Sequence, residues 1–258
     1  MLPPRALIGM VHLPPLPGAP AASQPLREIV AAAVADARRL AHAGFDAVMV
    51  ENFGDAPFRA TRVDPHTIAA MTVVAQAVRD AVDIPIGINV LRNDALAAVA
   101  IATVCEASFV RINVHSGVYA TDQGIIEGRA DETLRYRQML GSRVEIFADV
   151  HVKHAAPLST PDIGDAAEEI AYRGRADALI VSGPGTGKPV DMLELRTVKK
   201  AVPDRRLYVG SGATVEAAGE LLAVADGLIV GTAIKVGGRT TAPVDPERAA
   251  AMVRAVRA

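Results

Sequence analysis

The chain has 258 residues, of which 50% are hydrophobic, 22% are charged and only 3% are aromatic. This composition excludes a disordered or low-complexity chain and predicts a large core built from Val, Ile, Leu and Ala. The formal net charge of -2, from 27 Lys and Arg against 29 Asp and Glu, argues against nucleic acid or an anionic membrane surface as a partner.

Cysteine content and hydropathy indicate the compartment. Cys105 is the one cysteine, so no internal disulfide can form. The first residues lack the pattern of a signal peptide, and each apolar run is too short for a membrane span. We therefore expect a cytoplasmic protein with no membrane span, and the sequence leaves the oligomeric state open, a homo-oligomer included.

Short runs rich in Val and Ile alternate along the chain with longer stretches of Ala, Leu and Arg, a pattern typical of repeated strand and helix units. The expected strands cover residues 6–13, 47–52, 84–90, 109–114, 144–150, 178–182, 207–210 and 228–230. Three expected helices begin where a capping side chain precedes a proline, at Asp64-Pro65, Thr160-Pro161 and Asp245-Pro246. Eight units in a chain of about 250 residues predict one α/β domain over residues 1–258, a (β/α)8 TIM barrel. An open, doubly wound sheet is the alternative, because a count of strands does not show that the sheet closes.

The lengths of the connections give the expected barrel a direction. Links from helix to strand are short, whereas the strand-to-helix links at residues 14–24, 53–63 and 115–131 are long loops rich in Gly, Pro and polar residues. Long loops at the carboxyl ends of barrel strands are typical of an active face.

The inward-facing side chains at the expected strand ends are unusually polar. They are His12, Glu51, Asn52, Asn89, Arg111, Asn113, His115, Asp149, His151, Lys153 and Ser182. A buried polar group that loses its hydrogen bonds costs about 1–3 kcal/mol, so the convergence of so many favours a ligand site over a structural role. Four of the six histidines, His12, His115, His151 and His154, follow strand ends, whereas His42 and His66 fall in expected helices.

These residues are assigned roles in acid–base chemistry or binding. We expect Glu51, Asp149 and His151 to move protons. Asp149, His151 and Lys153 occupy alternate positions, so they project together if the strand extends that far. Lys153 either forms a Schiff base with a carbonyl substrate or makes an ordinary ion pair with Asp149 or a ligand oxygen. The expected substrate-binding side chains are His12, Asn52, Asn89, Arg111, Asn113, Ser182 and Lys188.

We expect no cofactor, although the sequence allows a divalent metal. His12, Glu51, Asp149 and His151 offer a mixed nitrogen and oxygen shell, but they come from separate strands with no close ligand spacing. Carboxylates and imidazoles in a barrel mouth serve acid–base chemistry equally well.

Small residues follow the last two expected strands. Gly210, Ser211 and Gly212 come after the seventh strand, and Gly231 and Thr232 come after the eighth. Many barrels bind phosphate with backbone N–H groups at these two positions. The sequence therefore predicts a small phosphorylated ligand, with glycines that merely turn the chain as the alternative.

The stretch from Ser182 to Pro189 is similar to a nucleotide-binding Walker A loop but lacks two of its required residues. Ser182 stands where the first glycine belongs, and Pro189 stands where the hydroxyl residue belongs. A mobile glycine-rich loop that carries Lys188 to a ligand remains an open interpretation beside a solvated lysine on a turn.

Long motifs resemble those of the BtpA/SgcQ family across nearly the whole chain. They are IGMVHLPPLPG at 8–18, VENFGDAPF at 50–58, GINVLRND at 87–94, RINV at 111–114, TDQGIIEG at 121–128, DVHVKHA at 149–155 and SGPGTG at 182–187. The resemblance implies a barrel of the ribulose-phosphate-binding type and a family name tied to photosystem I biogenesis in cyanobacteria. It carries no assignment of catalytic residues.

Two functions follow as expectations. The first is an enzyme that acts on a small phosphorylated carbonyl compound as an isomerase, epimerase or lyase. The second is a non-catalytic assembly or stability factor. Such a factor, if regulated by a phosphorylated ligand, would be consistent with both hypotheses. The concentration of polar residues at one mouth favours the enzyme, because no long apolar stretch indicates a protein-binding patch.

Overall fold

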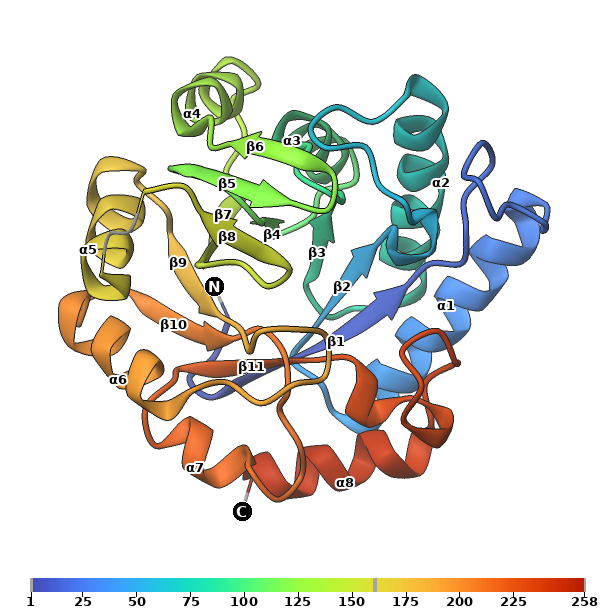
Figure 1. The fold of residues 1–258 in the computed structure, drawn as a ribbon. Coiled ribbons are helices and arrows are strands. Elements are labelled where there is room, and N and C mark those ends of the chain that lie inside the picture. The colour runs from blue at the N-terminus through green and yellow to red at the C-terminus, as the bar shows by residue number, and fades with distance from the viewer. Residues whose placement is uncertain (1, 160–161, 258) are drawn as a thin grey trace.

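The protein forms a closed barrel of eight parallel strands surrounded by helices (Figure 1). The structure is a computed structural model and describes residues 2–159 and 162–257. The barrel strands are β1 (Ala6–His12), β2 (Ala47–Glu51), β3 (Ile86–Asn89), β4 (Phe109–Ile112), β7 (Glu145–Val150), β9 (Ala178–Val181), β10 (Arg206–Val209) and β11 (Gly227–Val230). Strand β1 pairs in parallel with both β2 and β11, which closes the sheet. The predicted (β/α)8 barrel is therefore confirmed, and an open sheet is excluded.

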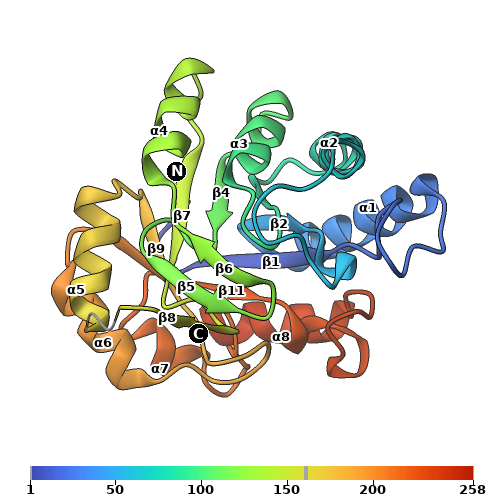
Figure 2. The same cartoon turned by 45° about the horizontal axis from the view of Figure 1, so that its top comes forward.

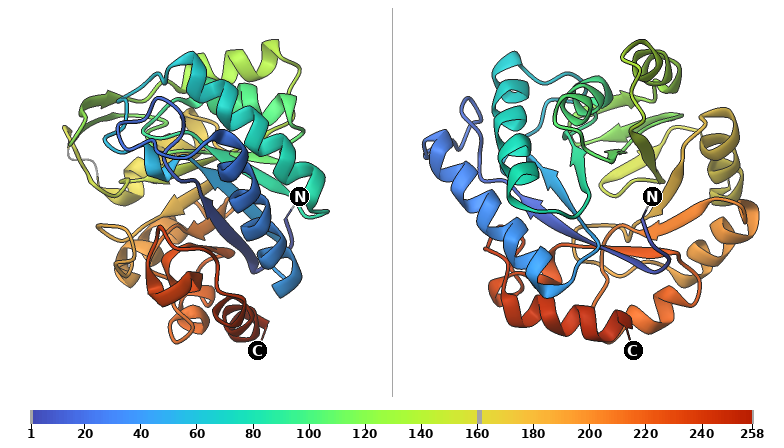
Figure 3. Two further views of the ribbon diagram at one scale, coloured as in Figure 1. Left: turned by 90° about the vertical axis from the view of Figure 1, so that its right-hand side faces the viewer. Right: turned by 180° about the vertical axis from the view of Figure 1, so that it is seen from behind.

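Helices ring the barrel, as the view from behind shows (Figure 3). They are α1 (Leu26–Ala43), α2 (Pro65–Ala81), α3 (Ala95–Val104), α4 (Ala130–Met139), α5 (Ile163–Glu168), α6 (Met192–Ala201), α7 (Ala218–Leu222) and α8 (Pro246–Arg257). In the part of the chain that the structure describes, no helix is both long and apolar enough to cross a membrane.

The three predicted helix starts are confirmed in part. Asp245 caps α8, because its Oδ1 accepts hydrogen bonds from two amide groups of the first turn at 3.0 and 3.2 Å. Helix α2 begins at Pro65, but the capping role predicted for Asp64 is wrong, since its carboxylate accepts from the guanidinium of Arg59 instead. Thr160-Pro161 lies outside the described residues, and α5 is capped by Asp162.

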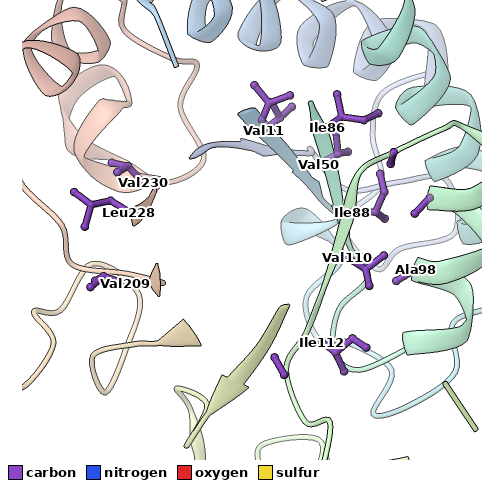
Figure 4. Close-up of a cluster of buried hydrophobic side chains, with 14 of the residues drawn as sticks. Val11, Val50, Ile86, Ile88, Ala98, Val110, Ile112, Val209, Leu228 and Val230 are labelled. Carbon is purple, nitrogen blue, oxygen red and sulfur yellow. The ribbon is translucent and has the colours of Figure 1, made fainter. Parts of the chain in front are cut away.

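Successive side chains of each strand point alternately to the helices and to the inside of the barrel, which gives two separate apolar cores. Outward residues such as Val50, Ile88 and Val110 face the helices and belong to the larger cluster (Figure 4). The inner cluster lies inside the barrel, where Phe109 stacks on Phe147 with ring centroids 4.7 Å apart. Tyr208 stacks on the other side of Phe147 at 4.9 Å. These rings fill the lower barrel, so the next inward positions towards the carboxyl ends form its upper layer.

A small antiparallel sheet stands at the carboxyl ends of β4 and β7 (Figure 2). Its strands are β5 (Val118–Thr121), β6 (Gly124–Glu127) and β8 (Ala155–Pro157), in the order β6-β5-β8. The expectation of a loop over residues 115–131 is therefore wrong, because those residues form a hairpin that β8 joins from another connection. The segment between β7 and β8, which carries Lys153, is thus held at both ends.

Candidate active site

A cavity of about 130 Å³ lies at the carboxyl ends of the barrel strands. All five residues predicted to bind phosphate line it, together with four of the predicted side chains: Gly210, Ser211, Gly212, Gly231 and Thr232, with His12, Glu51, Arg111 and Lys153. We call this space the mouth cavity. Its remaining lining residues are Met10, Thr186, Gly187, Ala213, Thr214, Ile229, Val230 and Ala233.

Two backbone segments form one wall of the mouth cavity, residues 210–214 after β10 and residues 231–233 after β11. We call them the glycine cradle. Within the described residues, the amide groups of Gly212, Ala213 and Thr232 have no protein acceptor. Unpaired amide groups beside a cavity favour an anion, which accepts their hydrogen bonds.

Side chains would not fit at two positions of the glycine cradle. Gly212 has a φ of 76°, and a Cβ there would overlap the carbonyl of Lys188. A Cβ on Gly231 would lie 2.8 Å from the ring of His12. Glycine is therefore required at Gly212 by its backbone conformation and at Gly231 by the close approach of His12.

His12 and Glu51 form a neighbouring pair in the mouth cavity because β1 and β2 place them side by side. His12 Nε2 lies 3.6 Å from Glu51 Oε1, and His12 Nδ1 lies 3.2 Å from the carbonyl of Thr240. Burial, with help from Lys235 and Lys153, lowers the pKa of His12 to about 3. Its imidazole is therefore neutral at neutral pH, with Nδ1–H donated to Thr240 and the Nε2 lone pair facing Glu51.

The carboxyl group of Glu51 is also displaced towards its neutral form. Burial raises its pKa, an effect that the nearby Lys153 and Arg111 oppose. A carboxyl group with a raised pKa beside a neutral imidazole provides two groups that can exchange protons in one cavity.

Asp149 is engaged by hydrogen bonds from three side chains. Arg111 donates to it twice, from Nε at 2.9 Å and from Nη2 at 2.7 Å. Asn113 donates at 2.9 Å and Ser182 at 3.3 Å. Asn89 in turn donates to Asn113 at 3.2 Å. Asp149 therefore fixes the guanidinium of Arg111 at the floor of the mouth cavity and has no free acceptor site aimed at a ligand.

Lys153 reaches the mouth cavity from the segment between β7 and β8. Burial lowers its pKa to about 8, and Arg111 adds to this effect while Glu51 and Asp149 oppose it. Arg92 Nη2 donates to the backbone carbonyl of Lys153 at 2.6 Å, which anchors the segment. Among the described residues, no carboxylate lies within 4.0 Å of its amine.

The expected alternation of Asp149, His151 and Lys153 is wrong at His151. Strand β7 ends at Val150, and His151 adopts a left-handed φ of 49°, so its side chain leaves the pattern of the strand. The His151 ring lies against Tyr119 with centroids 6.4 Å apart and does not line the mouth cavity. Burial lowers its pKa.

Four other predicted residues lie away from the mouth cavity. Asn52 accepts from the amide of Leu91 at 2.7 Å and donates to Asp55 at 3.0 Å, so it ties two loops together. His115 is bonded to the carbonyl of Gly174, and Lys188 is exposed. His154 accepts a hydrogen bond from the amide of Thr186 at 3.4 Å.

Metal binding gains no support from this arrangement. Across residues 2–159 and 162–257, no three His, Cys, Asp or Glu side chains gather as a metal site requires. His12 and Glu51 lie together, whereas Asp149 is bonded to Arg111 and His151 is outside the mouth cavity.

Sequence reasoning missed several lining residues. Met10 lies two positions before His12 on β1, so strand alternation alone predicts that both face inward. Thr186 and Gly187 lie in the glycine-rich stretch that resembles a Walker A loop, and only the folded connection shows that they reach the mouth cavity.

The fold and the site together define a (β/α)8 barrel with a ligand cavity at the carboxyl ends of its strands. The chain belongs to the BtpA family, whose model matches residues 4–258. An uncharacterized protein of Thermococcus kodakarensis is 50% identical over 249 residues, which cover 96% of this chain and 94% of the relative. The photosystem I biogenesis protein BtpA of Synechocystis is 44% identical over 250 residues, 97% of this chain and 87% of that protein.

Solved structures show the same fold. Phosphoribosyl anthranilate isomerase from Thermus thermophilus superposes with a TM-score of 0.60 at 12% identity, covering 98% of each chain. At this identity the likeness shows the barrel fold alone.

Proposed function

We propose that this protein is an enzyme that acts on a small phosphorylated carbonyl compound by isomerisation, epimerisation or carbon–carbon bond cleavage. The observation that carries the proposal is the shared cavity: the glycine cradle and the acid–base pair His12 and Glu51 line the same space. An anion held on the glycine cradle places the rest of a small molecule against these two side chains. The isomerase from Thermus thermophilus, whose name contains a phosphoribosyl group, has a barrel of the same kind.

Each group receives a role that its surroundings support. Glu51, whose raised pKa favours its protonated form, donates a proton to the substrate oxygen, and neutral His12 accepts one from carbon or oxygen through Nε2. Arg111, fixed by Asp149, provides positive charge for the oxyanion that forms when a carbon next to the carbonyl loses its proton. Asn89, Asn113 and Ser182 hold this floor in place.

These roles differ from those that the sequence suggested. Asp149 becomes a positioning residue because its oxygens are already engaged. His151 takes no part in proton transfer because it lies outside the mouth cavity. His12 takes its place as the imidazole of the site.

A stability screen tests ligand binding. Each phosphorylated sugar is compared with the same sugar without its phosphate. A ligand at 100 times its Kd raises stability by about 2.7 kcal/mol. At about 2–4 °C per kcal/mol for a chain near this size, the melting temperature should rise by about 5–11 °C. The dephosphorylated compound should give no such shift, and equal shifts from both members of a pair would refute the phosphate assignment.

Proton exchange in D2O then tests catalysis. An isomerase or epimerase of this kind breaks the C–H bond next to the substrate carbonyl and exchanges that hydrogen with solvent, and a carbon–carbon lyase places a solvent hydrogen on the carbon that it releases. Glu51→Gln should slow this exchange by about 10²–10⁴-fold. The matched control is Glu132→Gln, an exposed carboxylate in a surface pair with Arg129.

A non-catalytic assembly factor is the second candidate. It is favoured by the name of the Synechocystis relative, which is a photosystem I biogenesis protein at 44% identity. A phosphorylated compound that stabilises the protein but never exchanges its hydrogen or changes structure would support an assembly factor regulated by that ligand.

A further inference from the structure

Lys153 differs from the other lysines of the chain in its surroundings. The sequence contains five lysines, and all lie in the described part of the chain. Lys199 pairs with Asp226 at 2.7 Å, and Lys235 pairs with Asp36 at 2.8 Å. Lys188 and Lys200 are exposed. Of the five lysines, Lys153 alone lines the mouth cavity, and no carboxylate among the described residues lies within 4.0 Å of its amine.

The backbone around Lys153 holds it in this position. His151 and His154 adopt φ values of 49° and 58°, a left-handed conformation that is costly outside glycine. Arg92 donates to the Lys153 carbonyl, and β8 begins two residues further on. An ordinary phosphate-binding cation does not need such a fixed backbone, because lysine acts there as a flexible point charge.

The surroundings of the amine favour its neutral form on balance. Burial has the largest effect, Arg111 and Arg92 add to it, and Glu51 and Asp149 oppose it. With a pKa of about 8, roughly a tenth of the amine is neutral at pH 7, against fewer than about one in a thousand for an ordinary lysine. A neutral amine is the form that attacks a carbonyl carbon.

We propose that Lys153 is a nucleophile that forms an imine with the carbonyl group of the phosphorylated ligand in the mouth cavity. This inference rests on the proposed function, since it requires the glycine cradle to hold the phosphate. It deepens that function, because it selects covalent catalysis through an amine over an enediolate formed without one.

The imine forms through a carbinolamine. The Nζ lone pair bonds to the carbonyl carbon, and the carbonyl oxygen takes a proton from Glu51, which gives a carbinolamine. Nζ then loses a proton to Nε2 of His12, and the imidazolium of His12 returns this proton to the hydroxyl group, which leaves as water. The product is a protonated imine, and addition of water reverses the sequence. The imine withdraws electrons from the adjacent carbon, which weakens its bonds to hydrogen and to carbon.

Reductive trapping tests the inference on the full chain. Dihydroxyacetone phosphate is the carbonyl probe, and sodium borohydride reduces any imine to a stable amine. We expect a mass increase equal to the probe less one oxygen atom, located on the peptide that contains Lys153. Lys153→Arg should remove this adduct. The exposed-lysine control Lys200→Met should keep it.

A second probe separates the two claims. Glycerol 3-phosphate has the phosphate group but no carbonyl, so it should stabilise the wild type and Lys153→Arg alike without any adduct. If glycerol 3-phosphate stabilises the wild type and no adduct forms at Lys153, the imine is refuted while phosphate binding stands. If neither probe binds, both proposals fail. Labelling spread equally over the exposed lysines also refutes the imine.

The rate of labelling at Lys153 should also depend on pH, because only the neutral amine reacts. The rate of adduct formation at Lys153 should rise with pH and level off above about 8, because further neutral amine is no longer gained. A rate that keeps rising towards pH 10 would show an ordinary surface lysine and would refute the proposal.

Discussion

Loss of the charge on Asp149 should destabilise the fold strongly. The side chains of Arg111 and Asp149 are 1% and 0% exposed, and two hydrogen bonds of 2.9 and 2.7 Å join them. In Asp149→Asn the guanidinium remains buried without its counter-charge. Removal of one partner of a buried pair costs about 3–5 kcal/mol. At about 2–4 °C per kcal/mol, the melting temperature should fall by about 6–20 °C.

Urea denaturation followed by circular dichroism measures this cost, since the midpoint falls with the free energy of unfolding. The double variant Arg111→Met with Asp149→Leu should lose less stability than Asp149→Asn alone, because neither charge is then left buried and unpaired. The surface control Glu132→Gln breaks an exposed pair and should cost no more than about 1 kcal/mol. An Asp149→Asn variant as stable as this control would refute the positioning role and restore Asp149 as a candidate for proton transfer.

Two further predictions concern packing and acid stability. Gly87→Ala should lower the free energy of unfolding by about 1–3 kcal/mol, because its Cβ would overlap the ring of Phe109. The control Gly219→Ala places its Cβ in open space and should not lose stability. The midpoints of urea denaturation compare the two variants. His12 has a folded pKa of about 3, so its contribution to stability is complete above pH 6.5 and is lost as the pH falls from 6.5 towards 3. His12→Gln should therefore lose less stability than the wild type between pH 7 and pH 4, by an amount on the order of a few kcal/mol in urea titrations, and equal losses would show that His12 is not held neutral.

The barrel was predictable because its strands are buried on both faces. Runs such as those around Val48 and Ile88 are apolar up to the last residue of the strand, which is typical of parallel strands covered by helices. The period of two then places Glu51 and Arg111 inward at the upper layer, so the position of the site follows from strand phase.

The missed elements have different physical causes. The hairpin of β5 and β6 carries a sequence signal, since two four-residue strands flank Asp122 and Gln123, but its glycine and polar content is also typical of a loop. Strand β8 has three residues and depends on pairing with β5, which lies more than thirty positions away. No sequence pattern predicts it.

The roles of individual side chains depend on distances that a sequence does not contain. The sequence suggests that Asp149 is a free carboxylate, but in the structure Arg111 and Asn113 donate hydrogen bonds to it. The sequence suggests that His151 continues β7, but its left-handed backbone turns its side chain out of the pattern of the strand. A left-handed histidine is uncommon and is fixed by tertiary context.

Phosphate binding by the glycine cradle is tested most directly by calorimetric titration of inorganic phosphate into the wild type, Thr232→Val and Thr232→Asp. Valine keeps the shape of Thr232 and leaves the amide groups free, whereas aspartate keeps a similar size and adds a negative charge to the mouth cavity. We predict that the wild type and Thr232→Val bind phosphate with similar affinity and that Thr232→Asp does not bind it. Equal binding by all three proteins, or none by the wild type, would contradict the assignment of this cavity to a phosphorylated ligand.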